Sequence, residues 1–165
     1  MAADFGCNVG GFTDCLLHEG AARVYAVDTG YGVLAWKLRQ DERVVVLERT
    51  NAMHVQLPES THVVAVDVAW TRQCRILPNA LRQLKPGGIV LSLFKPQYEG
   101  GREVVRRGRV KPEDFDGVLE GTLAQLAGMG IPVRTVVPLP HLDARKNPEA
   151  MLHIVGDDCT PTAKG

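Results

Sequence analysis

The segment Asp4–Asp14 (DFGCNVGGFTD) contains the glycines from which a ligand-binding turn could be built. Gly6 permits a tight turn, and Gly10 and Gly11 would let the backbone approach a ligand closely. The dinucleotide-binding turn has the spacing G-x-G-x-x-G, but Asn8 occupies the position of its second glycine. The segment therefore indicates a ligand turn of another kind, or else a glycine-rich structural turn.

Two acids accompany this turn. Asp4 stands two residues before Gly6, where a carboxylate would repel a pyrophosphate and suits a ligand that carries a cation, such as the amino group of S-adenosylmethionine. Asp28 ends the short strand expected over Arg23–Asp28, where it could accept hydrogen bonds from ribose hydroxyls. The alternative for Asp28 is a helix cap with no ligand.

A lysine and two further acids are expected near the ends of other strands. Lys95 follows an apolar strand directly, Asp67 lies near the end of another, and Glu149 lies in the loop that leads into a third. Strand ends of a parallel sheet converge on one edge, so these groups could share a cleft. A lysine beside a hydroxyl can stabilise a developing alkoxide, or act as a base if its pKa is lowered, and carboxylates can orient it. Asp67 could instead cap a helix, and Glu149 could be an ordinary loop acid.

The stretch Gly100–Lys111 is the longest polar and basic part of the chain and is expected to be a loop. Its cations could contact RNA phosphates. The alternative is a solvated loop, as most runs of charge are. The candidate RNA-binding residues are Arg102, Arg106, Arg107, Arg109 and Lys111.

Apolar runs alternate with helical periods along the chain, which predicts an α/β, doubly wound, mostly parallel sheet. A strand before the glycine turn would have only Met1–Ala3 ahead of Asp4, so the first strand is expected to be truncated. The other expected strands are Arg23–Asp28, Arg43–Glu48, His62–Val68, Gly87–Lys95, Ile131–Val137 and Met151–Val155. The expected helices are Thr13–His18, Tyr31–Gln40, Thr71–Leu84 (bent or split at Pro78) and Pro112–Met129.

Composition sets limits on function. The chain has 165 residues and zero formal net charge, so any attraction to nucleic acid must be local. Four cysteines without CxxC spacing predict reduced thiols in a cytoplasmic protein and no metal site, and the apolar runs are too short to cross a bilayer.

We expect one domain over residues 1–156 and a flexible tail over 157–165. Trp36 and Trp70 are expected to pack inside, although Trp70 could line the cleft.

Four segments resemble the TlyA (hemolysin A) family of FtsJ-like methyltransferases: GGFTDCLL, VYAVDTGYGVLAWKLRQDERVVVLERTN, VVAVDV and LFKPQYEGGRE. The resemblance extends from about Asp4 to Val155. It implies a seven-stranded class I methyltransferase sheet of Rossmann-like type. It also implies S-adenosylmethionine as cofactor and methylation of ribose 2'-hydroxyls in ribosomal RNA.

The resemblance assigns roles to residues by position. It places the methionine end of the cofactor on the turn, the ribose on Asp28 and the adenine beside Asn51, with Asp67 also in the cofactor set. In the family's catalytic set Lys-Asp-Lys-Glu, the last three match Asp67, Lys95 and Glu149. The residues assigned to the turn are Asp4, Gly6, Cys7, Asn8, Val9, Gly10, Gly11 and Phe12.

The chain departs from the family pattern in four places. The family's first catalytic lysine lies upstream of the glycine turn and has no counterpart here, and neither has the amino-terminal RNA-binding domain. Ala69-Trp70 replaces the last two residues of the family's DVSF, and Lys146 replaces the glycine before Asn-x-Glu. One alternative is therefore a catalytically impaired cofactor-binding relic or fragment. Another is a Rossmann-type enzyme using a nicotinamide cofactor, which Asp4 and the turn spacing disfavour.

Overall fold

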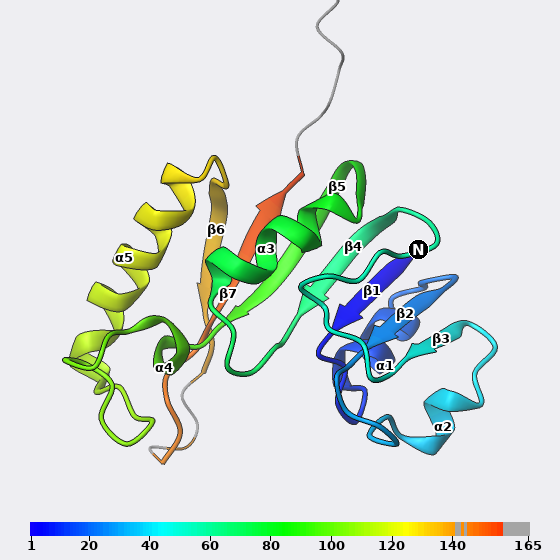
Figure 1. The fold of residues 1–165 in the computed structure, drawn as a ribbon, viewed down its shortest axis with the longest axis horizontal. Coiled ribbons are helices and arrows are strands. Elements are labelled where there is room, and N and C mark those ends of the chain that lie inside the picture. The colour runs from blue at the N-terminus through cyan, green and yellow to red at the C-terminus, as the bar shows by residue number, and fades with distance from the viewer. Residues whose placement is uncertain (141–142, 144, 157–165) are drawn as a thin grey trace, which may run out of the picture.

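The computed structural model describes residues 1–140, 143 and 145–156. Within these residues seven strands form one sheet in the order β3-β2-β1-β4-β5-β7-β6, and only β7 runs antiparallel to its neighbours (Figure 1). This confirms the predicted mostly parallel sheet; the predicted tail over 157–165 lies outside the described residues. The strands are β1 (Ala2–Phe5), β2 (Val24–Val27), β3 (Val44–Leu47), β4 (Thr61–Val66), β5 (Leu84–Phe94), β6 (Val133–Pro138) and β7 (Ala150–Val155).

Helices pack on both faces of the sheet, so the predicted doubly wound architecture is also confirmed. Ile76 of α3 and Leu126 of α5 belong to one buried cluster with the sheet, while Leu17 of α1 and Leu38 of α2 belong to a second. The helices are α1 (Gly11–His18), α2 (Trp36–Arg39), α3 (Gln73–Arg82), α4 (Pro96–Glu99), the 3-10 turn η1 (Pro112–Asp114) and α5 (Phe115–Gly128).

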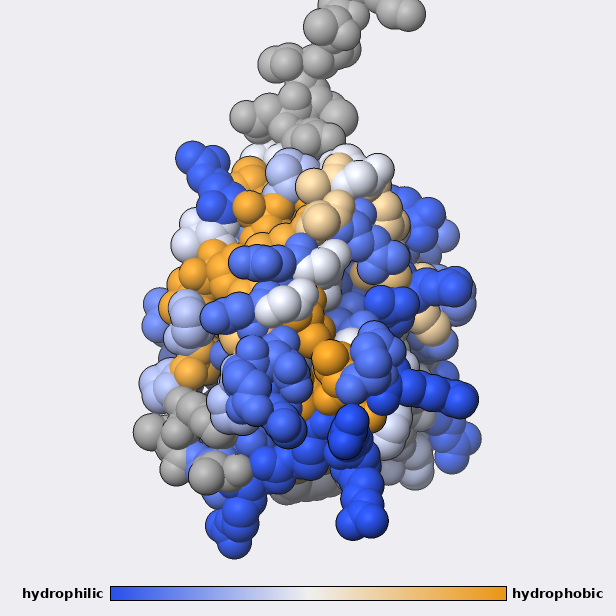
Figure 2. All heavy atoms as spheres, turned by 90° about the vertical axis from the view of Figure 1, so that its left-hand side faces the viewer, coloured by the Kyte–Doolittle hydropathy of each residue, from blue (hydrophilic) through white to orange (hydrophobic). Residues whose placement is uncertain are grey.

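The central strand β1 sets the position of the site. All four of its residues are buried, and it pairs in parallel with both β2 and β4. Phe5 lies in register with Val27 and with Val66, so the residues that follow these three strands leave the sheet at the same edge. This carboxyl edge is the lower end of the molecule in Figure 1, and Figure 2 shows hydrophilic side chains projecting from that end.

Two helices differ from the prediction. The helix expected over 31–40 is reduced to the single turn α2, because the backbone before it bonds elsewhere: Val33 N donates to Glu48 Oε1 (3.1 Å) and Ala35 N to the Val9 carbonyl (3.1 Å). Of the two outcomes expected at Pro78, a bend or a split, the split is wrong, because α3 runs through this proline as one element.

Candidate active site

A cleft of about 380 Å³ lies at the carboxyl edge of β1, β2 and β4 and brings together residues from several loops. It joins the glycine turn, the residue after β2, the segment after β3 and the ends of β4 and β5, as parallel topology predicts. The predicted site residues that line it are Gly6, Asn8, Asp28, Asn51, Asp67 and Lys95. The structure thus places cofactor candidates and catalytic candidates in one cleft.

The glycines of the turn are required for different reasons. Gly6 has φ +88°, and a Cβ there would lie 2.3 Å from the Asp67 carbonyl oxygen, so only glycine lets the turn pass the end of β4. Gly10 has φ +103°, and a Cβ there would lie 2.2 Å from Leu38 Cδ1. A helix therefore lies against Gly10, where we expected a ligand, whereas Gly11 faces open space.

Asp28 fastens two loops at the edge of the cleft. Its Oδ2 accepts a hydrogen bond from Asn8 N (2.9 Å) and its Oδ1 accepts one from Gly30 N (2.7 Å). The next helix begins only at Trp36, so Asp28 is not a helix cap. Each carboxylate oxygen has two lone pairs, so Asp28 can still accept hydrogen bonds from a bound ligand.

Asp4 is fully buried beneath the turn. Its Oδ2 accepts a hydrogen bond from Thr13 Oγ1 (2.7 Å), while Oδ1 has no hydrogen-bond partner among the described residues. Burial, opposed by the Thr13 bonds and reinforced by Asp67 and Asp28, raises the pKa of Asp4 from 3.8 to about 6. Three acids close enough to influence one another create a negative potential that suits a cationic ligand.

The remaining turn residues contribute chiefly backbone. Cys7 is buried, and its desolvation, with neighbouring acids, raises the pKa of the thiol to about 12, so the side chain is a neutral packing group. Val9 is exposed and Phe12 is half-buried.

Lys95 and Asp67 form an ion pair at the mouth of the cleft, with Lys95 Nζ donating to Asp67 Oδ1. Both side chains are partly shielded, being 18% and 32% exposed. Asp67 does not cap α3, whose N-cap position is Arg72 and has no side-chain cap. Pro96 follows Lys95 and favours the extended backbone seen there (φ −124°, ψ 104°), which continues the direction of β5.

Glu149 lies near this pair although it does not line the cleft. Burial raises the pKa of its carboxyl, Lys95 opposes that rise and Asp67 adds to it, so Glu149 stands within electrostatic range of both. Its carbonyl accepts a hydrogen bond from Leu139 N (2.9 Å), which fixes the backbone just before β7. Glu149 precedes Ala150, which is in register with Phe94, the residue before Lys95, so the three predicted catalytic residues are close together.

A buried polar network behind Lys95 was not anticipated from the sequence. Glu99 Oε1 accepts a hydrogen bond from Gln73 N (2.6 Å), and Gln73 Oε1 accepts one from Ser92 Oγ (2.6 Å). Burial raises the pKa of Glu99. These bonds fix the start of α3 to α4 and β5, on either side of Lys95. The only sequence signal for this network was the KPQYE segment, which contains Glu99. An isolated serine or glutamine, such as Ser92 or Gln73, carries no such signal.

The expectation that both tryptophans pack inside is wrong. Trp70 is 88% exposed and Trp36 73% exposed. Trp70 has φ +60°, lines the cleft, and its ring centroid lies 5.4 Å from that of Tyr98 at 45°. The left-handed backbone turns this indole outward. It therefore offers a stacking face beside Lys95.

The cations of the basic loop that follows α4 fall into two groups, those that are exposed and those that bond to other parts of the chain. Arg102, Arg106 and Arg107 are exposed, so they can still contact phosphates. Arg109 instead donates to the carbonyl oxygens of Arg145 and Lys146. Lys111 Nζ lies 3.2 Å from Glu113 Oε1 on the surface.

No group of three or more His, Cys, Asp or Glu side chains that could hold a metal occurs in the described part of the chain. Over the same residues, no helix is both long and apolar enough to span a membrane. Cys7, Cys15 and Cys74 are free thiols, and Cys159 lies outside the described range.

Relatives share both the sequence and the fold. YqxC of Bacillus subtilis, provisionally named an rRNA methyltransferase, is 41% identical over 157 residues, which cover 92% of this chain and 56% of YqxC. The 16S/23S rRNA (cytidine-2'-O)-methyltransferase TlyA of Mycobacterium tuberculosis is 43% identical over 111 residues, which cover 65% of this chain and 41% of TlyA. The chain thus spans about half the length of these relatives.

Solved structures agree with the sequence comparison. A protein from Streptococcus thermophilus, provisionally named a hemolysin, is 35% identical with a TM-score of 0.87, covering 98% of this chain and 62% of its own. N-methyltransferase NodS from Bradyrhizobium japonicum with S-adenosyl-L-homocysteine has a TM-score of 0.65 at 14% identity, covering 94% and 76%, and shares the fold alone. The FtsJ-like methyltransferase family matches residues 1–126, and together with the cleft, its acids and Lys95, this shows that the chain belongs to that family.

Proposed function

We propose that this chain transfers a methyl group from S-adenosylmethionine to a ribose 2'-hydroxyl of RNA, with ribosomal RNA as the substrate. The observation that carries the proposal is the Lys95–Asp67 ion pair, which lies in the same cleft as Asp28 and the glycine turn. The names of the relatives YqxC and TlyA specify rRNA and, for TlyA, the cytidine 2'-oxygen, and they support this choice of acceptor.

The cleft residues fit the cofactor's chemistry. Asp28 would hold the ribose hydroxyls, Asn51 would lie beside the adenine, and the turn from Asp4 to Phe12 would face the methionine end. The buried oxygen of Asp4 without a partner, together with Asp28 and Asp67, supplies negative potential for a ligand that carries a sulfonium and an amino group. When bound, S-adenosylmethionine supplies the electrophilic methyl group.

The chain's own residues would act on the acceptor. Lys95 Nζ would donate to the 2'-oxygen and stabilise the negative charge that develops there, while Asp67 holds the ammonium in place. Glu149 has a raised pKa near this pair, which suits a carboxylate that takes up the hydroxyl proton. Alignment of hydroxyl and methyl group can remove roughly 7–11 kcal/mol of the barrier. The exposed Trp70 would stack on the acceptor base.

The test is methyl transfer from labelled S-adenosylmethionine to ribosomal RNA by the purified chain. A 2'-O-methyl group blocks alkaline cleavage of the adjacent phosphodiester, so the product must contain an alkali-resistant dinucleotide. Lys95→Ala should lower the rate by roughly 10²–10⁴-fold. Lys95→Arg should not restore it, because a planar guanidinium has another shape and would not place a donor at the same point. Cofactor affinity should stay within a few-fold.

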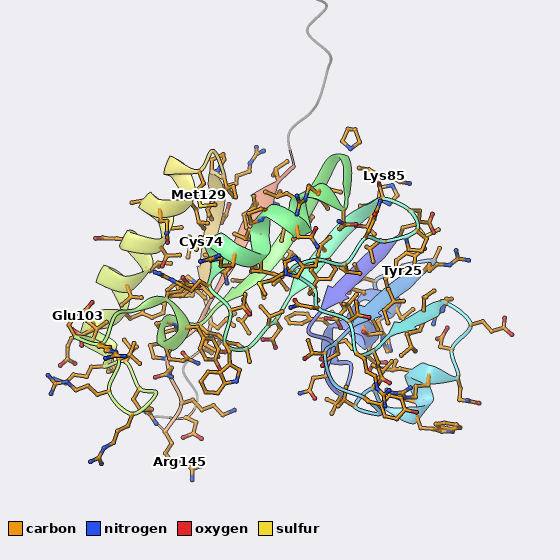
Figure 3. All side chains as sticks on the ribbon, in the orientation of Figure 1. Tyr25, Cys74, Lys85, Glu103, Met129 and Arg145 are labelled. Atoms are coloured by element: carbon orange, nitrogen blue, oxygen red, sulfur yellow. The ribbon has the colours of Figure 1, made fainter. Side chains whose placement is uncertain are left out.

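Lys85 provides the matched control, since it lies near the start of β5, the strand that Lys95 follows, and at the upper end of the molecule in Figure 3. Lys85→Ala should transfer methyl groups at the wild-type rate. Methylation of a base instead of the ribose, or equal rates for Lys95→Ala and the wild type, would contradict the proposal. The alternative of an impaired cofactor-binding protein predicts cofactor binding without any transfer.

A further inference from the structure

The basic loop contains a tight hairpin over Arg106–Arg109, here called the arginine hairpin. Arg106 N donates to the Arg109 carbonyl (2.9 Å), and Arg109 N donates to the Arg106 carbonyl (3.0 Å). The two central residues, Arg107 and Gly108, have φ +51° and +73°, as a two-residue hairpin turn of type I′ requires. The side chains of Arg106 and Arg107 are thus presented on an ordered turn.

Asn147 attaches the arginine hairpin to the loop before β7. Its Oδ1 accepts a hydrogen bond from Val110 N (2.9 Å), and its Nδ2 donates to the Gly108 carbonyl (3.0 Å). The Arg109 guanidinium adds bonds to carbonyls of the same loop. Val110 is only 3% exposed, so the attachment has a buried anchor. In Figure 3 the label Glu103 marks the basic loop at the left of the molecule, and the label Arg145 marks the loop before β7 at the lower end.

The attached loop carries a proposed catalytic group two residues further on. Pro148 separates Asn147 from Glu149, and its fixed φ restricts the backbone between them. Glu149 is held on its other side by the bond from Leu139 N, and it precedes Ala150, which is in register with Phe94, the residue before Lys95. A short, restrained path therefore connects the arginine hairpin to the Lys95 pair.

We propose that Asn147 is a positioning residue that couples RNA held on Arg106 and Arg107 to the placement of the Glu149 carboxyl beside Lys95. Asn147 touches neither the acceptor nor the cofactor in this scheme and acts through Glu149. The inference rests on the proposed function, since it assumes methyl transfer to RNA. It assigns to the Asn-Pro-Glu segment a second task, which is to link substrate contact to the catalytic carboxyl.

The test is a double-mutant cycle in single-turnover methyl transfer at saturating RNA and cofactor. Asn147→Ala should lower the rate by about 10-fold, a typical coupling within one hydrogen-bonded network. In a Glu149→Gln background the same change should lower the rate by less than about 2-fold, because its target is gone. A merely structural role would produce the same loss in both backgrounds, and that result would overturn the proposal.

Two controls keep the result interpretable. Arg145→Ala alters the same loop but keeps the carbonyl that Arg109 contacts, so its rate should equal the wild type. Hydrogen exchange should show faster exchange at 108–110 and 145–149 in Asn147→Ala and unchanged exchange in the core. If Asn147→Ala folds poorly, Asn147→Asp keeps the acceptor for Val110 N, removes the donor to Gly108 and should show an intermediate loss.

The outcomes separate the two proposals. If the wild type transfers methyl groups and Asn147→Ala does so equally fast, the positioning role is wrong and the proposed function stands. If the wild type binds cofactor and RNA but never transfers a methyl group, the proposed function fails, and the positioning role fails with it.

Discussion

Asp4 should make the protein less stable as the pH rises through the weakly acidic range. The folded carboxyl keeps its proton until its pKa of about 6, whereas the unfolded chain releases it near 3.8. Between these values the folded state binds more protons, so the free energy of unfolding falls as pH rises from about 4 to about 6. The shift corresponds to about 3 kcal/mol, and a side chain this deeply buried is little screened by solvent.

Asp4→Asn removes this ionisation. The amide oxygen can still accept the Thr13 hydroxyl bond, while the amide nitrogen would replace the buried Oδ1 that lacks a hydrogen-bond partner, at a penalty of about 1–3 kcal/mol. That penalty does not depend on pH. The variant should therefore gain about 3 kcal/mol relative to the wild type between pH 4 and pH 8, whatever its stability at pH 4.

The measurement is urea unfolding of both proteins at several pH values from 4 to 8. Asp116→Asn, at an exposed position on α5, is the control and should differ from the wild type by a constant amount. Parallel stability curves for Asp4→Asn and the wild type would refute the argument. On the proposed function the variant should also bind S-adenosylmethionine more weakly, which calorimetry at pH 8 would show.

Three further predictions concern ligand binding. Asp28→Ala should weaken the binding of S-adenosylmethionine by roughly 1–3 kcal/mol and should not bind NAD. Micromolar binding of NAD to the wild type, measured by calorimetry, would contradict the cofactor assignment. Replacing Arg106 and Arg107 by Ala should lower RNA affinity and flatten the dependence of that affinity on salt concentration. The control Arg134→Ala, on β6, should change neither quantity. If the double variant keeps the wild-type salt dependence, the loop is only a solvated surface. Trp70→Ala should weaken the binding free energy for single-stranded RNA by about 1–3 kcal/mol per lost stacked base. It should leave stability unchanged, since the indole is exposed, and a lowered Tm would instead indicate a packing role.

The positions of the strands along the chain could be predicted largely from the sequence, whereas their order in the sheet was not predicted. Runs such as Val44–Leu47 and Val63–Val66 are apolar throughout, as is typical of parallel strands with both faces buried, and this signal depends on neighbouring residues only. The prediction of a helix over Tyr31–Gln40 was wrong for the opposite reason. Its amides bond to Glu48 and Val9, which are distant in sequence, and such partners override local helical periodicity.

The candidate site was predictable where it follows from topology. Asp28, Asp67 and Lys95 each follow a strand, and parallel register alone brings them to one edge. Exposure was not predictable in this way. Trp70 was expected to pack because large apolar side chains usually do, but its left-handed backbone turns it to the surface.

The sequence by itself determined the sheet, the glycine turn, the lysine and the acids, because each of these depends on residue type and short spacing. Only the tertiary structure decided what each group contacts. It placed Leu38 against Gly10, buried Asp4 beneath the turn and used the side chain of Arg109 to hold the hairpin. It also joined Asn147 to residues about 40 positions earlier in the chain. Hydrogen bonds and burial of this kind depend on chain segments that meet only after folding, so no local pattern reveals them.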